Sequence, residues 1–481
     1  MKNLCPCPGK SSAYLLPSLH KLMIAAILLI SASRSLTAAD YYWVGGSGDW
    51  SDINHWVTTS GGTVNYTLVP TANDNVFFDE NSFTAAGQTV VINAGNYVCR
   101  DMDWTEALFH PTLSSAPGNE LRIYGSLLLT SDMNYDLRGE LLFEATSAGH
   151  RIDMAGHQTK NAVSFNGAAG SWSLLSSLDA QGFTIYFRAG NLNTQGYDIH
   201  CGTFSSDFTT HRSLDLQSSE ITADASWIMN AQQLSLMPGQ SRIILTSATA
   251  AFLNKGGLIT YNHVVFSDTN GLVSMINQPG TWTRFNSVTF LCNAKIYGNY
   301  ELNRLYLYNK DYEFRGNDTL TIHQDLITTG NCSASVYIRT DCDSIKAYIR
   351  KPSGSLVVSR LIMQDIAGVG PATYHALQSV DLGNNPGWNI QSPQALTLYW
   401  VGGSGRWDDP SHWSFTSGGP GGACVPNPLD NVRFDHLSFN GSGQTVYLNT
   451  FNAFCNDMDW SGAAHHPAFS GTFPSSLNIF R

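Results

Sequence analysis

Two sets of side chains in this sequence can do chemistry, and each set occurs twice along the chain. The first set is aromatic and comprises Trp43, Trp50, Trp56, Trp400, Trp407 and Trp413. Exposed indole rings stack on the faces of sugars, so these six tryptophans are candidate ligand-binding residues for a glycan. The alternative, which we favour, is that the rings pack together over a small core while neighbouring glycines form tight turns.

The second set is acidic and comprises two pairs, Asp101 with Asp103 and Asp457 with Asp459. In a β-strand, residues two apart point to the same face, so each pair presents two carboxylates together. Such a pair can hold Ca²⁺ through oxygen ligands, or can serve as the acid and base of glycoside hydrolysis. Aspartate also hydrogen-bonds backbone amides at turns and strand ends, and this structural role is the alternative that we favour. Calcium is the one cofactor that the pattern suggests.

Both sets belong to one module that recurs. Residues 42–50 return as residues 399–407, an offset of 400 − 43 = 357, and Asp101–Trp104 returns at an offset of 356 as Asp457–Trp460. Residues 40–119 therefore form one copy and residues 391–481 a second copy. The second copy stops where the first leads into strand-like segments, so we expect it to be truncated. The module is better interpreted as a cap or entry segment than as an independent binding domain.

The elements between the two copies, residues 120–390, are expected to be short strands. Their apolar segments alternate with period 2 and are separated by Gly, Asn and Ser, and the segment 383–388 (GNNPGW) closes the region. We favour a right-handed parallel β-helix, a solenoid capped by the module, since Asn-Gly and Asp-Gly hairpin turns are rare. Tandem β-sandwiches are the alternative all-β fold.

The N-terminal residues 1–39 have the pattern of a signal peptide, with basic residues before an apolar run at Leu22–Ile30 and small residues before Asp40. No later segment is apolar enough to span a membrane. We therefore expect an exported protein at the outer cell surface or outside the cell. The formal net charge of −11, without a basic cluster, disfavours nucleic acid as a partner.

The spacing of the cysteines does not indicate a disulfide framework. Two of the nine lie before Asp40, and the remaining odd number requires at least one thiol that is free or bonded to another chain. Cys332 and Cys342 are candidates for a local bridge, although spacing alone never determines pairing.

The Trp-Gly-Gly-x-Gly-x-Trp…His-Trp opening at residues 43–56, with the closing segment 383–388, resembles exported, adhesin-like surface proteins of the Bacteroidetes type. In that class, this opening leads into β-helical coils. The resemblance implies a surface component and specifies architecture rather than activity.

Two functions are weighed on this basis. The first is a non-enzymatic surface or extracellular protein, adhesin-like or scaffolding, whose partners are glycans or other cell-surface components. The alternative is a glycan-binding or polysaccharide-degrading β-helix protein. A lyase would need a basic groove, and a hydrolase would need converging carboxylates. The Lys and Arg residues are scattered, and residues 120–348 hold no Asp/Glu cluster, so we do not expect an enzyme.

Overall fold

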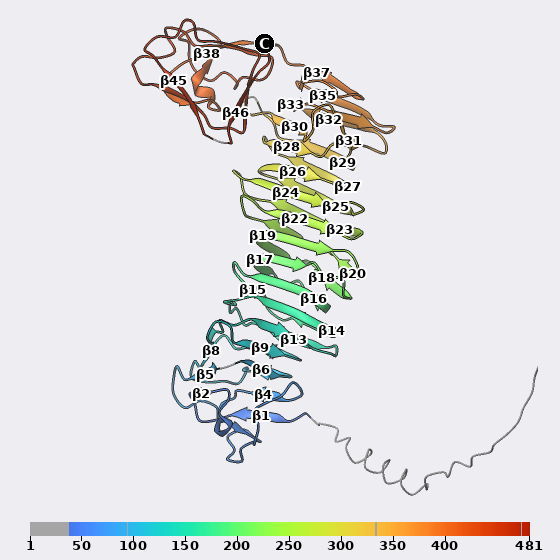
Figure 1. Ribbon diagram of the computed structural model, residues 1–481, viewed down its shortest axis with the longest axis vertical. Helices are drawn as coiled ribbons and strands as arrows, with labels where there is room; N and C mark the ends of the chain where they lie inside the picture. The colour runs from blue at the N-terminus through green and yellow to red at the C-terminus, as the bar shows by residue number, and fades with distance from the viewer. Residues whose placement is uncertain (1–37, 94, 332–333, 473) are drawn as a thin grey trace, which may run out of the picture. The chain divides into compact units, whose positions relative to one another are not determined.

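The computed structural model describes residues 38–93, 95–331, 334–472 and 474–481 (Figure 1). The expected signal peptide lies outside these ranges except for its last two residues. Asp40–Arg481 form one compact unit, an all-β parallel solenoid of about 18 turns. The parallel β-helix is thus confirmed over tandem sandwiches. The described ranges contain no α-helix and only two short 3₁₀ helices, η1 (Ile53–His55) and η2 (Pro410–His412).

The strands of the first module and of the turns directly after it are short. They are β1 (Asp40–Trp43), β2 (Gly48–Asp49), β3 (Trp56–Val57), β4 (Asn75–Phe77), β5 (Thr89–Ile92), β6 (Asn96–Cys99), β7 (Met102–Asp103), β8 (Thr112–Ser115), β9 (Glu120–Ile123), β10 (Leu127–Leu128), β11 (Asn134–Asp136), β12 (Leu141–Phe143) and β13 (His150–Asp153).

The middle turns contain the longest strands. They are β14 (Val163–Leu174), β15 (Leu178–Asp179), β16 (Thr184–Asn193), β17 (Ile199–Ser206), β18 (Arg212–Asp215), β19 (Glu220–Asn230), β20 (Leu234–Met237), β21 (Arg242–Leu245), β22 (Ala251–Lys255), β23 (Leu258–Phe266), β24 (Leu272–Asn277), β25 (Trp282–Phe290), β26 (Asn293–Tyr297), β27 (Asn299–Leu307), β28 (Asp311–Phe314) and β29 (Thr319–Thr328).

The last turns and the second module complete the chain. They contain β30 (Val336–Thr340), β31 (Ala347–Arg350), β32 (Ser355–Ser359), β33 (Leu361–Met363), β34 (Ile366–Val369), β35 (Thr373–Leu377), β36 (Val380–Asp381), β37 (Trp388–Gln391), β38 (Thr397–Trp400), β39 (Gly405–Arg406), β40 (Trp413–Ser414), β41 (Asn431–Arg433), β42 (Thr445–Leu448), β43 (Asn452–Cys455), β44 (Asp457–Asp459), β45 (Ala468–Gly471) and β46 (Ser476–Ile479).

The solenoid core is a set of side-chain columns that run from turn to turn. Ile199 pairs with Ile221 and Ile221 with Ile243, a spacing of 22 residues in each case (221 − 199 and 243 − 221). The column continues through Val264, Val288, Leu305 and Leu326. All seven side chains are buried. Period-2 alternation places every second residue inside, so stacked turns align these aliphatic side chains into one dry core.

Three asparagine side chains form a short ladder across neighbouring turns of the solenoid. Asn286 Nδ2 donates to Asn262 Oδ1 at 3.1 Å, and Asn303 Nδ2 donates to Asn286 Oδ1 at 3.1 Å. These residues interrupt the backbone register at the same place in β23, β25 and β27. Side-chain amides thus supply hydrogen bonds where the strand ladder breaks, which keeps the polar atoms at that position paired.

The first module is the beginning of the solenoid. β1 pairs in parallel with β4, β4 with β7, and β7 with β10. The ladder β5–β8–β11 likewise crosses the expected boundary at residues 119/120. β3 lies antiparallel to β1 and forms the first edge of the ladder. The aromatic module is therefore an entry segment whose sheets continue directly into the turns.

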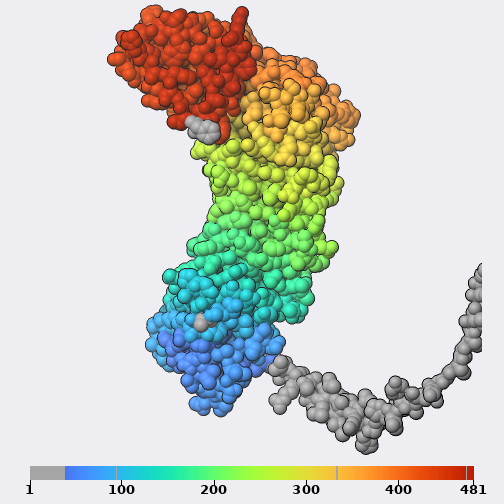
Figure 2. All heavy atoms as spheres, in the orientation of Figure 1, coloured from blue at the N-terminus to red at the C-terminus, as the bar shows by residue number. Residues whose placement is uncertain are grey.

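The second module repeats this arrangement in its own sheets. The order β40-β38-β41-β44 matches the order β3-β1-β4-β7 of the first copy. Its buried side chains form a separate core that includes Trp400, Trp407 and Trp413. It packs against the last turns of the solenoid through the rings of Tyr337 and Phe454, whose centroids lie 5.2 Å apart. Figure 2 shows this module in red beside the yellow and orange turns.

The cysteines pair differently from the local bridge considered above. Cys342 is free and exposed, so a bridge from Cys332 to Cys342 is wrong; Cys332 itself lies outside the described residues. Cys99, Cys201, Cys292 and Cys455 are also free. Cys424, in the second module, is disulfide-bonded.

A search of the described residues for a helix long and apolar enough to cross a membrane finds none.

Candidate functional site

The six repeated tryptophans are core residues. Trp43, Trp50, Trp56, Trp400, Trp407 and Trp413 each have 0% of their surface exposed. In both copies the third ring meets the first edge-on, with centroids 5.0 Å apart in the first copy and 5.1 Å apart in the second. A ring that is packed on all sides has no face on which a sugar can stack, so the geometry matches the packing alternative.

The spacing of the Trp, Gly and His residues in the repeated motif follows from the contacts around Trp43. Its Nε1 donates to the carbonyl oxygen of Gly46 at 2.7 Å, and the ring of His55 stacks on it at 4.5 Å between centroids. His55 Nδ1 lies 2.6 Å from the carbonyl oxygen of Val44. A Cβ atom at Gly48 would overlap the imidazole, so glycine is required there. The second copy repeats every one of these contacts.

The carboxylates of the first acidic pair are held by protein groups. Asp101 accepts a hydrogen bond from the backbone N–H of Ser126 at 2.6 Å and lies 3.1 Å from Arg100 Nε. Asp103 accepts from the backbone N–H and the hydroxyl of Thr105 at 2.9 and 2.6 Å. These contacts are the turn and strand-end bonds expected of aspartate.

The second pair, Asp457 and Asp459, shares the guanidinium of Arg433. Asp459 also accepts from the backbone N–H of Ser461 at 2.8 Å. Over the described ranges, no group of three or more His, Cys, Asp or Glu side chains is placed to hold a metal ion. Calcium binding at either pair therefore stays a prediction, and it would require ligands beyond these carboxylates.

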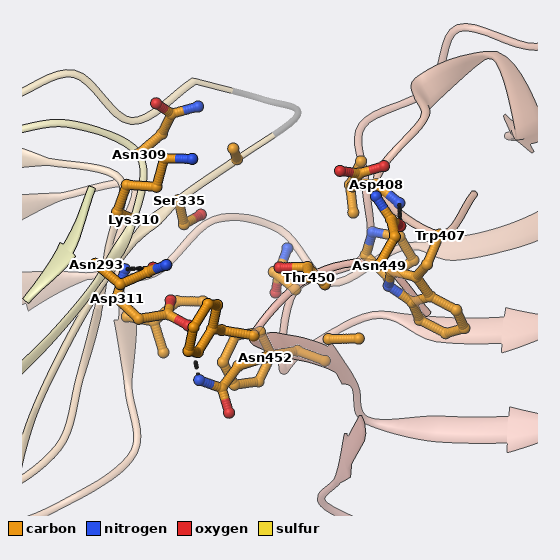
Figure 3. A pocket seen from close by; sticks show the side chains of 18 of the residues that line it. Asn293, Asn309, Lys310, Asp311, Ser335, Trp407, Asp408, Asn449, Thr450 and Asn452 are labelled. Atoms are coloured by element: carbon orange, nitrogen blue, oxygen red, sulfur yellow. Dashed lines mark hydrogen bonds between the residues drawn. The ribbon is translucent and has the colours of Figure 1, made fainter. Parts of the chain in front are cut away.

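A hollow lies where the second module meets the solenoid. This junction cleft has a volume of about 420 Å³. Residues 293, 309–311 and 335 of the solenoid line one side, and residues 406–408 and 449–454 of the module line the other (Figure 3). Six asparagines face it, namely Asn270, Asn293, Asn309, Asn427, Asn449 and Asn452. Its volume falls within the range of small-molecule sites.

The two module copies differ at one position that lines this hollow. In the first copy the Tyr97 ring lies 6.0 Å from the Trp50 ring, and its hydroxyl donates to Asn93 Oδ1 at 2.9 Å. At the offset of 356, the residue equivalent to Tyr97 is Ala453. The second copy therefore lacks this phenol; Ala453 lines the junction cleft, and the ring of Phe469 lies 6.1 Å from that of Trp407.

Two buried donors of the second copy belong to residues that line the cleft. Asn93 Nδ2 donates to Ser51 Oγ at 2.8 Å in the first copy. Its equivalent, Asn449 Nδ2, is buried and has no hydrogen-bond partner among the described residues. Trp407 Nε1 is likewise buried without a partner in that set, as is Trp50 Nε1 in the first copy. The indole of Trp407 borders the junction cleft (Figure 3).

The floor of the cleft is a hydrogen bond between the two parts of the chain. Asn452 Nδ2 donates to Asp311 Oδ2 at 2.7 Å. Burial raises the pKa of Asp311 to about 6, against the lowering effects of the Asn452 bond and of Arg339 and Lys310. This carboxylate is therefore held between the solenoid and the module at a net electrostatic cost.

We predict that Asp311→Asn removes a pH-dependent loss of stability. The folded state holds the proton more tightly than the unfolded state, whose pKa is near 3.8. The wild-type protein therefore loses stability as the pH rises from about 4 to 6, by at most about 3 kcal/mol because the group is partly solvated. Denaturation midpoints of both proteins at pH 4 and pH 7.5 measure the difference. Parallel pH profiles would contradict the assignment.

Sequence reasoning identified one cleft residue, Trp407, as a candidate for stacking on a sugar; its ring is packed in the core instead, and the residue lines the cleft. The asparagines were missed because they lie far apart in the chain and share no motif. One signal was present, since Ala453 breaks the match to Tyr97 within an otherwise close repeat. A large-to-small change inside a repeated core predicts a cavity.

Comparison of the chain with protein-family models, with curated proteins and with solved structures finds no match.

Proposed function

We propose that this chain is an exported, non-enzymatic surface or extracellular protein, adhesin-like or scaffolding in role. The observation that carries the proposal is the unbroken column of buried side chains from Ile199 to Leu326, which makes the solenoid a rigid spacer between two aromatic modules. Each turn contacts its neighbours along the column, so the separation of the two modules is determined by the number of turns.

Two further features support export. The disulfide at Cys424 is typical of an oxidising compartment outside the cytoplasm. The Trp-Gly-Gly opening and the 383–388 segment resemble exported surface proteins of the Bacteroidetes type. The outer surface of the solenoid also suits a scaffold. Many of its charged side chains form ion pairs between adjacent turns, as Arg122 does with Glu144 at 3.0 Å, and such pairs link one turn to the next.

The test is made in cells that express the full chain. Protease added to intact cells is expected to degrade the protein while a cytoplasmic marker stays intact. The purified protein is expected to release no reducing sugar or unsaturated product from a panel of neutral and acidic polysaccharides. Protection from external protease would refute export, and product release would establish the enzymatic alternative.

A further inference from the structure

We propose that the junction cleft is a binding site for a neutral saccharide. This inference goes beyond the scaffolding role, which does not require a ligand. It rests on the cleft itself, on its unpaired buried donors, and on the contrast between the two module copies, one with Tyr97 beside Trp50 and one with Ala453 in the lining of the cleft.

The polar lining of the cleft matches a ligand rich in hydroxyl groups. An asparagine amide both donates and accepts, as hydroxyl groups do. The amides of Asn293, Asn427 and Asn452 already bond within the protein at both ends. Asn449 is therefore the asparagine on which the proposed ligand contact depends. Asn449 Nδ2 and Trp407 Nε1 are buried donors without partners among the described residues, and an unpaired buried donor is unfavourable until an acceptor reaches it. A ligand hydroxyl placed between them would supply that acceptor.

The charges of the lining favour a neutral ligand over an anion. Lys310 is adjacent to the carboxylate of Asp311 in the chain, and Arg406 Nε lies 3.3 Å from Asp408 Oδ1. The cleft therefore has two cations and two carboxylates and no excess positive charge. A uronate, a sialylated glycan or a phosphate would meet a lining whose charges already sum to zero, so it would gain no net electrostatic attraction.

An apolar wall completes the site. Phe451 and Phe454 line the cleft on the module side, beside the small side chain of Ala453. Sugar-binding sites combine a few placed polar groups with such apolar surface, because a pyranose has both hydroxyl edges and C–H faces. The walls are held in place by the bond of Asn452 to Asp311 and by the packing of Tyr337 on Phe454.

The experiment uses the full mature chain on an array of neutral, uronate-containing and sialylated glycans, followed by calorimetric titration with the strongest neutral binder. We expect binding to neutral glycans only. Ala453→Tyr, which restores the phenol of the first copy, is expected to abolish binding while the melting temperature is kept. Asn449→Ala is expected to weaken binding about tenfold through the loss of one donor.

The matched control is Asn93→Ala, which removes the equivalent side chain from the first copy, outside the lining of the junction cleft; the affinity of this variant is expected to equal that of the wild type. Asn449→Ala keeps the test decisive if Ala453→Tyr fails to fold. A blank neutral array, preference for charged glycans, or equal affinity of wild type and Asn449→Ala would each overturn the proposal. None of these results would bear on export or on the scaffolding role.

Discussion

Arg212→Ala is expected to destabilise the middle of the solenoid by about 3 kcal/mol or more, because it leaves several buried carbonyl groups without donors. Arg212 is completely buried. Its Nη1 donates to the carbonyl oxygen and the hydroxyl of Ser206, both at 2.6 Å. Its Nη2 donates to the carbonyl oxygens of Asn230 and Gln232 at 3.0 and 2.6 Å, and its Nε to that of Thr210 at 3.0 Å.

The guanidinium is required here because its fork of five N–H donors reaches several strand ends at once. Burial lowers the pKa of Arg212 to about 10, so the charge itself is unfavourable at this position. The hydrogen bonds must therefore outweigh the desolvation of the cation. The change in stability on replacing Arg212 with an apolar side chain therefore shows which contribution is larger. An apolar side chain avoids the desolvation of the cation but leaves the carbonyl groups unpaired.

Arg212→Met separates the two effects, because it keeps the length and apolar stem of the side chain while removing every donor. We expect Met to be nearly as destabilising as Ala. Hydrogen exchange resolved along β17 to β20 is the appropriate measurement, since a solenoid unfolds in local units and a global midpoint averages over them. A Met variant as stable as the wild type would show that the hydrogen bonds contribute little.

The fold was predictable because the sequence pattern that specifies it is local and recurs in every turn. Period-2 alternation identifies strands without knowledge of their partners, and the scarcity of hairpin turns favours parallel stacking over antiparallel sandwiches. The column through Ile199, Ile221 and Ile243 follows from the same alternation repeated at constant spacing. The continuity of the first module with the turns was less visible, since the module is short-stranded and rich in Trp and Gly.

The junction cleft was not predictable in the same way. It depends on Asp311 and Asn452 meeting across 141 residues of chain, and no local pattern encodes that contact. Reading the two module copies against each other would have suggested a cavity at Ala453, but not what forms its other wall. The tryptophans could not be assigned from the sequence for a different reason. Indole rings occur both on binding surfaces and in cores, and only the burial seen in the structure distinguishes the two roles.

Trp413→Ala is expected to unfold the second module while the solenoid remains folded. Trp413 is completely buried between Trp400 and Trp407, and its Nε1 donates to the carbonyl oxygen of Trp407 at 2.8 Å. Replacing a buried tryptophan with alanine costs roughly 3–5 kcal/mol. A core as small as that of the second module has little stability in reserve, so a loss of this size is expected to exceed it.

The equivalent substitution Trp56→Ala is the matched comparison, because the ring has the same contacts but a different setting. The sheet that carries Trp56 continues through β4 and β7 into the turns, so stacking neighbours support the damaged segment. Hydrogen exchange is expected to show loss of protection across residues 396–481 in Trp413→Ala, but only near residues 40–80 in Trp56→Ala. Retained protection in both proteins would mean that neither module depends on its packed rings. The aromatic motif would then need another explanation, and a binding role for it would regain support.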